Sequence, residues 1–220
     1  MLQIYRVAPT DTPAFDALHA IYAAAIEPSE QKSGAELAAA FLHPRYHFIV
    51  AAEAGVIVGF SIVYLPQDAA IWVLEYLAVA SAHEGRGVGG QLFVHSAAIV
   101  GPGRTGLIEA DAEIGETDGS AKRRRRLAFY ARVGCRRLGD ISYLLPLKAN
   151  GTPPPMDLLV HAPDAVTCVP VETARDWLTR LYVEVYGQAA DDPRIDLMLA
   201  RQSREVALRS IESALRGPTV

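Results

Sequence analysis

The sequence predicts an α/β protein with a mixed, mostly antiparallel sheet of about seven strands, helices on both sides, and further helices at the carboxy end. Residues 46–79 hold three β-rich runs separated by short turns, which is typical of an antiparallel meander. A Gly-rich segment at 80–90 then leads into an amphipathic helix and another strand. We expect one domain over residues 1–165 and a helical extension over residues 166–220.

One strand and two helices are expected before the meander. Residues 3–7 alternate in hydropathy and stop before Pro9. Thr10 or Asp11 is placed to cap a helix whose apolar residues recur at helical spacing. Ser33 opens a shorter amphipathic helix, which ends before Pro44.

The chain after the Gly-rich segment alternates between helices and strands. The first helix runs to Val100, and a later one ends at Gly134, a residue type suited to the position just past a helix. The expected strands cover 107–114, 136–145 and 156–162, with a Pro-rich insert at 152–155 before the last of them. The expected carboxy-terminal helices cover 171–186 and 194–215.

Composition excludes several classes of protein. The 220 residues are half hydrophobic and carry a net charge of −4, so neither length nor charge indicates a nucleic-acid partner. Cys135 and Cys168 lie far apart and outside any metal-ligand spacing, so no metal site is expected. The sequence shows no signal peptide and no run long enough for a bilayer. We therefore expect a cytoplasmic protein that contacts no membrane.

The Gly-rich segment allows two functional interpretations. Residues 85–90 match the GxGxxG pattern of dinucleotide-binding units, but five residues separate them from the preceding strand, and that strand ends a meander. Under either interpretation the glycines let the backbone approach an anion, and a helix amino terminus binds phosphate oxygens. The alternative is a tight turn in which glycine serves packing alone.

Two motifs together resemble the GNAT superfamily of N-acetyltransferases. Residues 77–79 followed by 84–89 resemble its strand and its Gln/Arg-x-x-Gly-x-Gly loop, with Glu84 in the usual Gln or Arg position. Residues 125–135 resemble its tyrosine-bearing helix, with Tyr130 in the tyrosine position and Cys135 replacing phenylalanine. The resemblance covers residues 1–161. It implies acetyl-coenzyme A (acetyl-CoA) as cosubstrate.

The resemblance also implies which residues hold the cofactor. The main chain of Leu77, Ala78 and Val79 would pair with the pantetheine arm and the thioester oxygen. Arg123 or Arg124 would reach the 3′-phosphate, although a solvated or acid-paired helix face is the default interpretation of the basic run 122–126. The pyrophosphate would lie on the residues of the loop, namely Gly85, Arg86, Gly87, Val88, Gly89 and Gly90.

Six side chains are candidates for chemistry or acceptor binding. Tyr130 is the candidate general acid for the leaving thiolate, or else a core tyrosine. Glu75 is the candidate base, because strand parity places it on one face with Leu77 and Val79; a salt-bridged carboxylate is the alternative. Glu27 and Glu30 would hold a cationic acceptor. Glu109, and Glu113 beside it, are further cleft candidates.

The predicted function is N-acetylation of a primary amine by direct attack on acetyl-CoA. A non-catalytic acyl-CoA sensor and a dinucleotide-dependent oxidoreductase remain alternatives. An acyl-enzyme on Cys135 is disfavoured, because no histidine is placed to activate it. The acceptor would be a small-molecule or peptide amine, and the apolar stripes of the carboxy-terminal helices are compatible with a homodimer.

Overall fold

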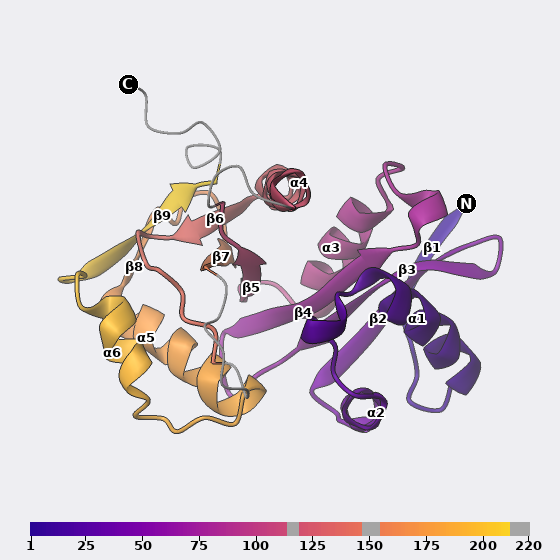
Figure 1. Ribbon diagram of the computed structural model, residues 1–220, viewed down its shortest axis with the longest axis horizontal. Helices are drawn as coiled ribbons and strands as arrows, with labels where there is room; N and C mark the ends of the chain where they lie inside the picture. The colour runs from indigo at the N-terminus through magenta and orange to yellow at the C-terminus, as the bar shows by residue number, and fades with distance from the viewer. Residues whose placement is uncertain (114–118, 147–154, 212–220) are drawn as a thin grey trace. The chain divides into compact units, whose positions relative to one another are not determined.

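The computed structural model describes residues 1–113, 119–146 and 155–211. Residues 1–104 and 105–220 form two compact units, here called unit 1 and unit 2 (Figure 1). The described residues include nine strands, and every strand pair within each unit is antiparallel. The predicted α/β class is confirmed.

Unit 1 is a four-stranded sheet in the order β1-β2-β3-β4, so the meander is confirmed. Pro9 and Pro44 both lie outside its helices, as expected. The bounds are β1 Leu2–Arg6, α1 Thr12–Ala25, a 3₁₀ turn Pro28–Glu30, α2 Gly34–Leu42, β2 Tyr46–Glu53, β3 Val56–Tyr64, β4 Ile71–Val79, a 3₁₀ turn Ser81–His83 and α3 Val88–Ile99.

The two predicted helix starts in unit 1 are confirmed by their caps. The Asp11 carboxylate accepts a hydrogen bond from the backbone N–H of Ala14 at 3.1 Å. Ser33 and Glu36 form a reciprocal capping box at the start of α2. Each cap satisfies backbone donors that have no partner inside the helix.

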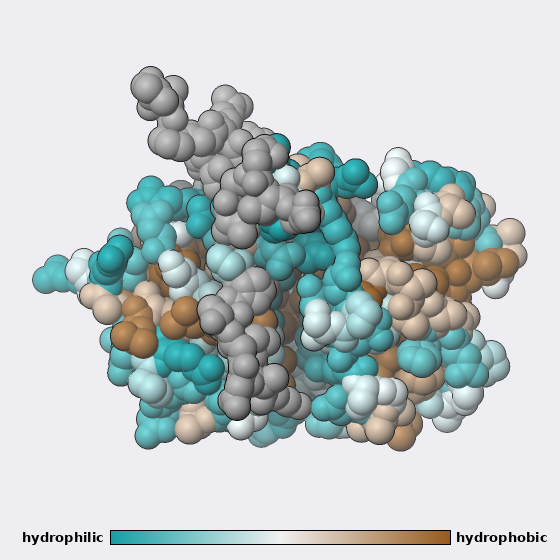
Figure 2. All heavy atoms as spheres, in the orientation of Figure 1, coloured by the Kyte–Doolittle hydropathy of each residue, from teal (hydrophilic) through white to brown (hydrophobic). Residues whose placement is uncertain are grey.

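The helices of unit 1 cover opposite faces of its sheet. Phe60 of β3 packs with Tyr22 of α1, at 6.0 Å between ring centroids. The neighbouring Ser61 shares a 2.7 Å hydroxyl hydrogen bond with Ser96 of α3. Because successive strand residues point to opposite faces, we call these the α1 face and the α3 face. Figure 2 shows both hydrophilic and hydrophobic residues on the visible surface of unit 1.

Unit 2 is a five-stranded sheet in the order β5-β7-β6-β9-β8. Helix α4 packs on β5 and β6, while α5 packs on β8, β9 and α6 (Figure 1). The bounds are β5 Thr105–Asp111, α4 Ser120–Arg132, β6 Cys135–Leu138, β7 Met156–His161, β8 Cys168–Pro170, α5 Val171–Arg180, a π-helical turn Leu181–Val185, α6 Pro193–Leu199 and β9 Glu205–Ser210.

Two predicted elements of unit 2 are wrong in part. The helix expected over 194–215 ends at Leu199, and residues 205–210 form β9 between β6 and β8. Buried Val206 and Leu208 alternate with less buried neighbours, and pairing on both sides favours a strand there. The strand expected over 136–145 ends at Leu138, since Gly139 has φ of 56° and turns the chain. Ile114 and Thr152, Pro153 and Pro154 of the predicted insert lie outside the described residues.

Candidate functional site

The Gly-rich segment forms the connection from β4 to α3, as predicted. Gly85 and Gly87 have φ of 74° and 80°, conformations that favour glycine, and Gly87 caps α3 without a side-chain hydrogen bond. The first helical bond runs from the N–H of Gln91 to the carbonyl of Gly87 at 3.2 Å. The N–H groups of the first turn, from Val88 to Gly90, therefore have no partner within the helix.

The space around these glycines fits an anionic group. A Cβ atom built on Gly85, Gly87 or Gly90 meets no heavy atom within 4 Å. Packing against the protein thus gives no reason for glycine at Gly90, although glycine inside a helix costs about 0.5–1 kcal/mol relative to alanine. Open space beside unpaired N–H groups at a helix start favours the phosphate-binding interpretation over a turn used for packing alone.

Arg86 of the loop is held by a carboxylate of β2. Its Nη2 atom lies 3.0 Å from Oε1 of Glu53, while Nε2 of His83 lies 3.6 Å from the other oxygen of Glu53. The Arg86 side chain is half exposed. The guanidinium therefore stays beside the loop, where its other N–H groups can meet a phosphate. The sequence pattern did not indicate Glu53.

A β-bulge at Glu75 changes the predicted orientation of this residue. Ile62 is opposite Tyr76 and Val63 is opposite Leu74, so Glu75 has no partner in the register of β3 and β4. Leu77 and Val79 lie opposite Ser61 and Gly59. These two partners contact α3, so Leu77 and Val79 face α3.

Glu75 and Tyr76 instead point to the α1 face. The Tyr76 ring packs edge-on against Tyr22 of α1, with centroids 5.0 Å apart. The carboxylate of Glu75 contacts Tyr46 and Lys32, which belong to the same side. The prediction that Glu75 shares a face with Leu77 and Val79 is wrong, because strand parity assumes a regular strand and the inserted residue breaks it.

Glu75 is buried and has two polar partners. Tyr46 donates its hydroxyl to Oε1 at 2.7 Å, and Nζ of Lys32 lies 3.0 Å from Oε2. Only 5 % of the Glu75 side chain is exposed. Burial, followed by the negative charge of Glu75, raises the pKa of Tyr46 well above its ordinary value, so Tyr46 remains a neutral donor.

The predicted acceptor segment lies beside this carboxylate. Tyr76 donates its hydroxyl to the carbonyl of Glu30 at 2.9 Å, and the N–H of Lys32 donates to Tyr22 at 2.7 Å. The structure thus brings the main chain of Glu30 next to the Glu75 cluster. Glu27 caps the 3₁₀ turn before Glu30 and has no side-chain capping bond there. Both acidic side chains are exposed.

Tyr130 lies on the buried side of α4 in unit 2. It is 8 % exposed, and burial raises the pKa of its phenol above the ordinary value, with the charge of Arg126 acting in the opposite direction. The phenol is therefore neutral and able to donate. The nearby thiol of Cys135 is buried and its pKa is raised to about 12, which disfavours a thiolate nucleophile.

Some arginines of the basic run in α4 form ion pairs with carboxylates. Arg126 lies 3.1 Å from Asp111, and Arg124 lies 3.6 Å from Glu113, which confirms the acid-paired interpretation for these two arginines. Arg123 is in the first turns of α4, and its Nη1 atom is 3.4 Å from where a Cβ of Gly119 would lie. Its proposed contact with the 3′-phosphate stays a prediction.

Glu109 of β5 accepts hydrogen bonds from two tyrosines. Tyr186, just past the π-helical turn, donates its hydroxyl at 2.5 Å, and buried Tyr143 donates to the other oxygen.

Sequence reasoning missed Lys32, Tyr46, Tyr143 and Tyr186. Each contact joins segments at least 29 residues apart, or 43 for Lys32 and Glu75, and no local spacing signals it.

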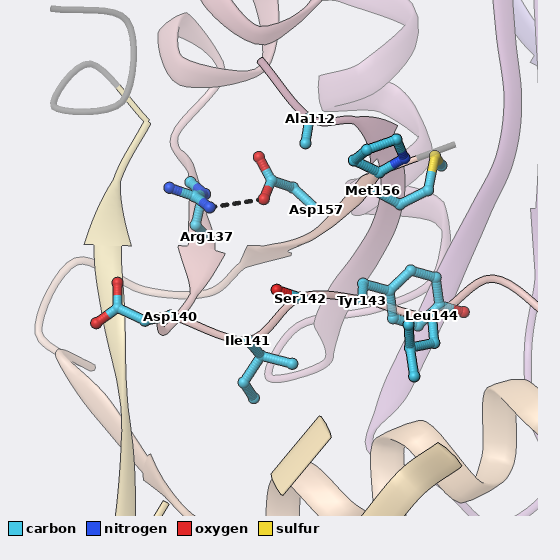
Figure 3. Close-up of a pocket in the computed structure, with 10 residues that line it drawn as sticks. Ala112, Arg137, Asp140, Ile141, Ser142, Tyr143, Leu144, Met156 and Asp157 are labelled. Atoms are coloured by element: carbon cyan, nitrogen blue, oxygen red, sulfur yellow. Dashed lines mark hydrogen bonds and ion pairs between the residues drawn. The ribbon is translucent and has the colours of Figure 1, made fainter. Parts of the chain in front are cut away.

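Unit 2 also has a cavity of about 490 Å³ beside β6 and β7. Figure 3 shows Arg137 and Asp157 pointing toward one another there, with 2.7 Å between their charged atoms. Asp157 is buried, and Ile141 and Leu144 supply apolar lining. This partly buried ion pair accounts for Arg137 and Asp157, which are two of the polar residues that line the cavity.

Within residues 1–113, 119–146 and 155–211, no three His, Cys, Asp or Glu side chains lie together as a metal would require. In these ranges no helix combines the length and the apolar character needed to cross a bilayer.

Comparison with known proteins finds a family match within this chain. Residues 44–136, from just before β2 to β6, match the family model described as an acetyltransferase (GNAT) domain. The matched segment, which is less than half of the chain, is similar to the acetyltransferase domain of the GNAT superfamily. No curated protein matches the sequence of this chain. Because β4, the Gly-rich loop and α4 all lie in the matched range, both GNAT motifs of the sequence lie in the domain itself.

Solved structures agree on the fold. A GNAT-family protein of Bacteroides thetaiotaomicron is 18 % identical, with a TM-score of 0.68 over 85 % of this chain and 99 % of that one. The ribosomal-protein-S18-alanine N-acetyltransferase of Escherichia coli is 20 % identical, with a TM-score of 0.52 over 73 % and 91 %. An aminoglycoside 6′-N-acetyltransferase complexed with coenzyme A is 21 % identical, with a TM-score of 0.53 over 72 % and 95 %.

Proposed function

We propose that this enzyme transfers the acetyl group of acetyl-CoA to a primary amine by direct attack. The GNAT-domain match over residues 44–136 supports acyl transfer from acyl-CoA to amines in general. The observation that carries the finer proposal is the chemistry within unit 1's last strand and directly after it. A buried carboxylate interrupts β4 at Glu75, and an open Gly-rich helix start follows the strand at Gly85.

Each step of the proposed reaction can be assigned to residues of this chain. The first-turn N–H groups of α3, with Arg86, bind the pyrophosphate, while the main chain of β4 at Leu77–Val79 holds the pantetheine arm and the thioester oxygen. Glu75 takes a proton from the acceptor ammonium, and the resulting amine attacks the carbonyl. Tyr130 donates to the leaving thiolate. The buried thiol of Cys135, with its raised pKa, supports direct transfer over an acyl-enzyme.

The acceptor is proposed to be a small-molecule or peptide amine. The exposed side chains of Glu27 and Glu30 supply negative charge that attracts a cation, and the main chain of Glu30 contacts Tyr76, which is next to Glu75. We also propose Glu109 as an acceptor contact, because its carboxylate is held in a fixed orientation by Tyr143 and Tyr186.

Two measurements test the function. We expect acetyl-CoA to bind in calorimetry and NAD not to bind. We then expect at least one member of a panel of polyamines, amino acids, aminoglycosides and peptide amino termini to release free thiol from acetyl-CoA. Binding without release for every amine would favour the sensor, and NAD binding without acetyl-CoA binding would favour the oxidoreductase.

Tyr130→Phe should lower kcat by about 10²-fold and leave KM for acetyl-CoA nearly unchanged, because only the proton donated to the thiolate is lost. Burial raises the pKa of Tyr130 above its ordinary value of 10.0, so ionisation of this residue should produce no basic limb in the rate below pH 10. The measurement is the pH profile of kcat for both proteins. Tyr182→Phe is the matched control, since its buried phenol lies in the same unit and donates to a main-chain carbonyl.

A further inference from the structure

The ion pair between Lys32 and Glu75 places a primary amine of the protein itself at the candidate base. Nζ of Lys32 lies 3.0 Å from Oε2 of Glu75 and 5.9 Å from the centroid of the Tyr76 ring. The Lys32 side chain is 24 % exposed. A carboxylate, an aromatic face and partial burial together form a site for an alkylammonium ion, and Lys32 occupies it.

The backbone fixes Lys32 in this position. Its N–H donates to the hydroxyl of Tyr22 at 2.7 Å, and the residue before it, Gln31, donates through its side-chain amide to the carbonyl of Ile26 at 2.8 Å. Tyr76, next to Glu75 in β4, holds the carbonyl of Glu30. Contacts on both sides of the cluster therefore keep the ammonium beside the carboxylate, which lowers the entropic cost of a reaction there.

Lysine is rare in this chain. The chain has 18 arginines and three lysines, Lys32, Lys122 and Lys148. An arginine would also pair with Glu75, but its guanidinium stays charged and is a poor nucleophile, whereas a lysine becomes nucleophilic once it loses a proton. The lysine is thus the residue type that can react at this site.

We propose that the enzyme acetylates its own Lys32. This rests on the proposed function, because acetyl-CoA and Glu75 are its reactants. The Lys32 ammonium gives one proton to Glu75, which passes it to solvent, and the neutral amine attacks the thioester carbon. The C–N bond forms as the C–S bond breaks, and the thiolate takes the second nitrogen proton. The products are acetyl-lysine, the free thiol of coenzyme A and one proton.

Self-acetylation would change the site. Acetylation removes the positive charge of Lys32, so the ion pair with Glu75 is lost while the Tyr46 hydrogen bond to Glu75 remains. Glu75 then has a free oxygen to receive the ammonium of an external acceptor. The modified enzyme is therefore the form with an unblocked base.

The test is peptide mass spectrometry of the full chain incubated with acetyl-CoA and no other amine. We expect Lys32 to be acetylated at least about 10-fold faster than the exposed Lys122, a gain in the range of general-base catalysis. Excess coenzyme A should suppress labelling of Lys32 alone, because it competes for the cofactor site. The rate constant should not change with protein concentration. Equal labelling of Lys32 and Lys122 would reveal plain chemical acetylation and overturn the proposal.

Two variants separate the possible failures. Glu75→Gln should slow Lys32 labelling by about 10-fold or more, and Lys32→Arg should remove the fast label from the intact protein. The competition with coenzyme A uses the wild-type protein, so it tests whether Lys32 is acetylated from the cofactor site even if a variant does not fold. Absence of acetyl-CoA binding in calorimetry would defeat the proposed function, whereas binding and amine turnover without Lys32 labelling would defeat this inference alone.

Discussion

Gly87→Asp is expected to weaken acetyl-CoA binding by at least about 100-fold, or about 2.7 kcal/mol. Gly87 is the cap of α3, with φ of 80° and open space around its missing side chain. An aspartate there puts a carboxylate where the pyrophosphate would lie, and its side chain can take the first-turn N–H groups for itself. The ligand would meet both a like charge and occupied donors. Calorimetry at constant ionic strength measures the change.

The control for this variant is at the other end of the same helix. Gly101 has φ of 94°, and a Cβ there meets no atom within 4 Å, so Gly101→Asp imposes similar backbone strain and the same charge. We expect it to bind acetyl-CoA like wild type. Gly87→Ala adds the methyl group without the charge and should fall between the two. If Gly87→Asp is folded and binds within a few-fold of wild type, the phosphate does not lie on this helix.

Motifs within one segment were predictable from the sequence. The loop is local: its glycines, the strand before it and the helix after it are contiguous, so the sequence determines the position of the unpaired N–H groups. The caps at Asp11 and Ser33 are local for the same reason, since each pairs with a residue three positions along. Hydrogen bonds between residues that are close in the sequence can therefore be predicted from the sequence.

Contacts between distant segments were not predictable in the same way. The bulge at Glu75 depends on how β3 and β4 pair, and one inserted residue moves the side chain from the expected face to the α1 face. Strand β9 was expected to be helix because Leu199, Val206 and Ile211 also fit a helical period. Pairing with β6 and β8 decides in favour of a strand, and that pairing joins residues about 70 and 37 positions apart.

The missed partners of Glu75 changed what this residue can do. Strand parity alone predicts that the carboxylate of Glu75 faces the same way as Leu77. In the structure only 5 % of the Glu75 side chain is exposed, and its carboxylate contacts Lys32 and Tyr46. A base that begins in an ion pair must exchange its partner before it meets an acceptor. The electrostatic state of the site therefore comes from long-range contacts, even though the carboxylate was found by sequence.

Glu75→Gln is expected to lower kcat with any acceptor found in the panel by about 10²-fold or more, because glutamine cannot take the ammonium proton. KM for acetyl-CoA should change little, since the loop is intact. Glutamine still accepts the Tyr46 hydroxyl, so the shape of the site is kept. Steady-state thiol release measures both constants.

Glu75→Gln leaves the charge of Lys32 without a partner, and the resulting loss of stability would also reduce activity. This effect needs a control of its own. Removing one partner of a buried ion pair destabilises a protein because the other charge stays unpaired. The Lys32→Gln/Glu75→Gln double variant removes both charges and should recover the thermal midpoint lost by Glu75→Gln alone. If Glu75 is the base, kcat stays low in the double variant although the fold is restored. Recovery of kcat together with the midpoint would show that Glu75 only balances Lys32, and the base would have to be sought among other carboxylates such as Glu109.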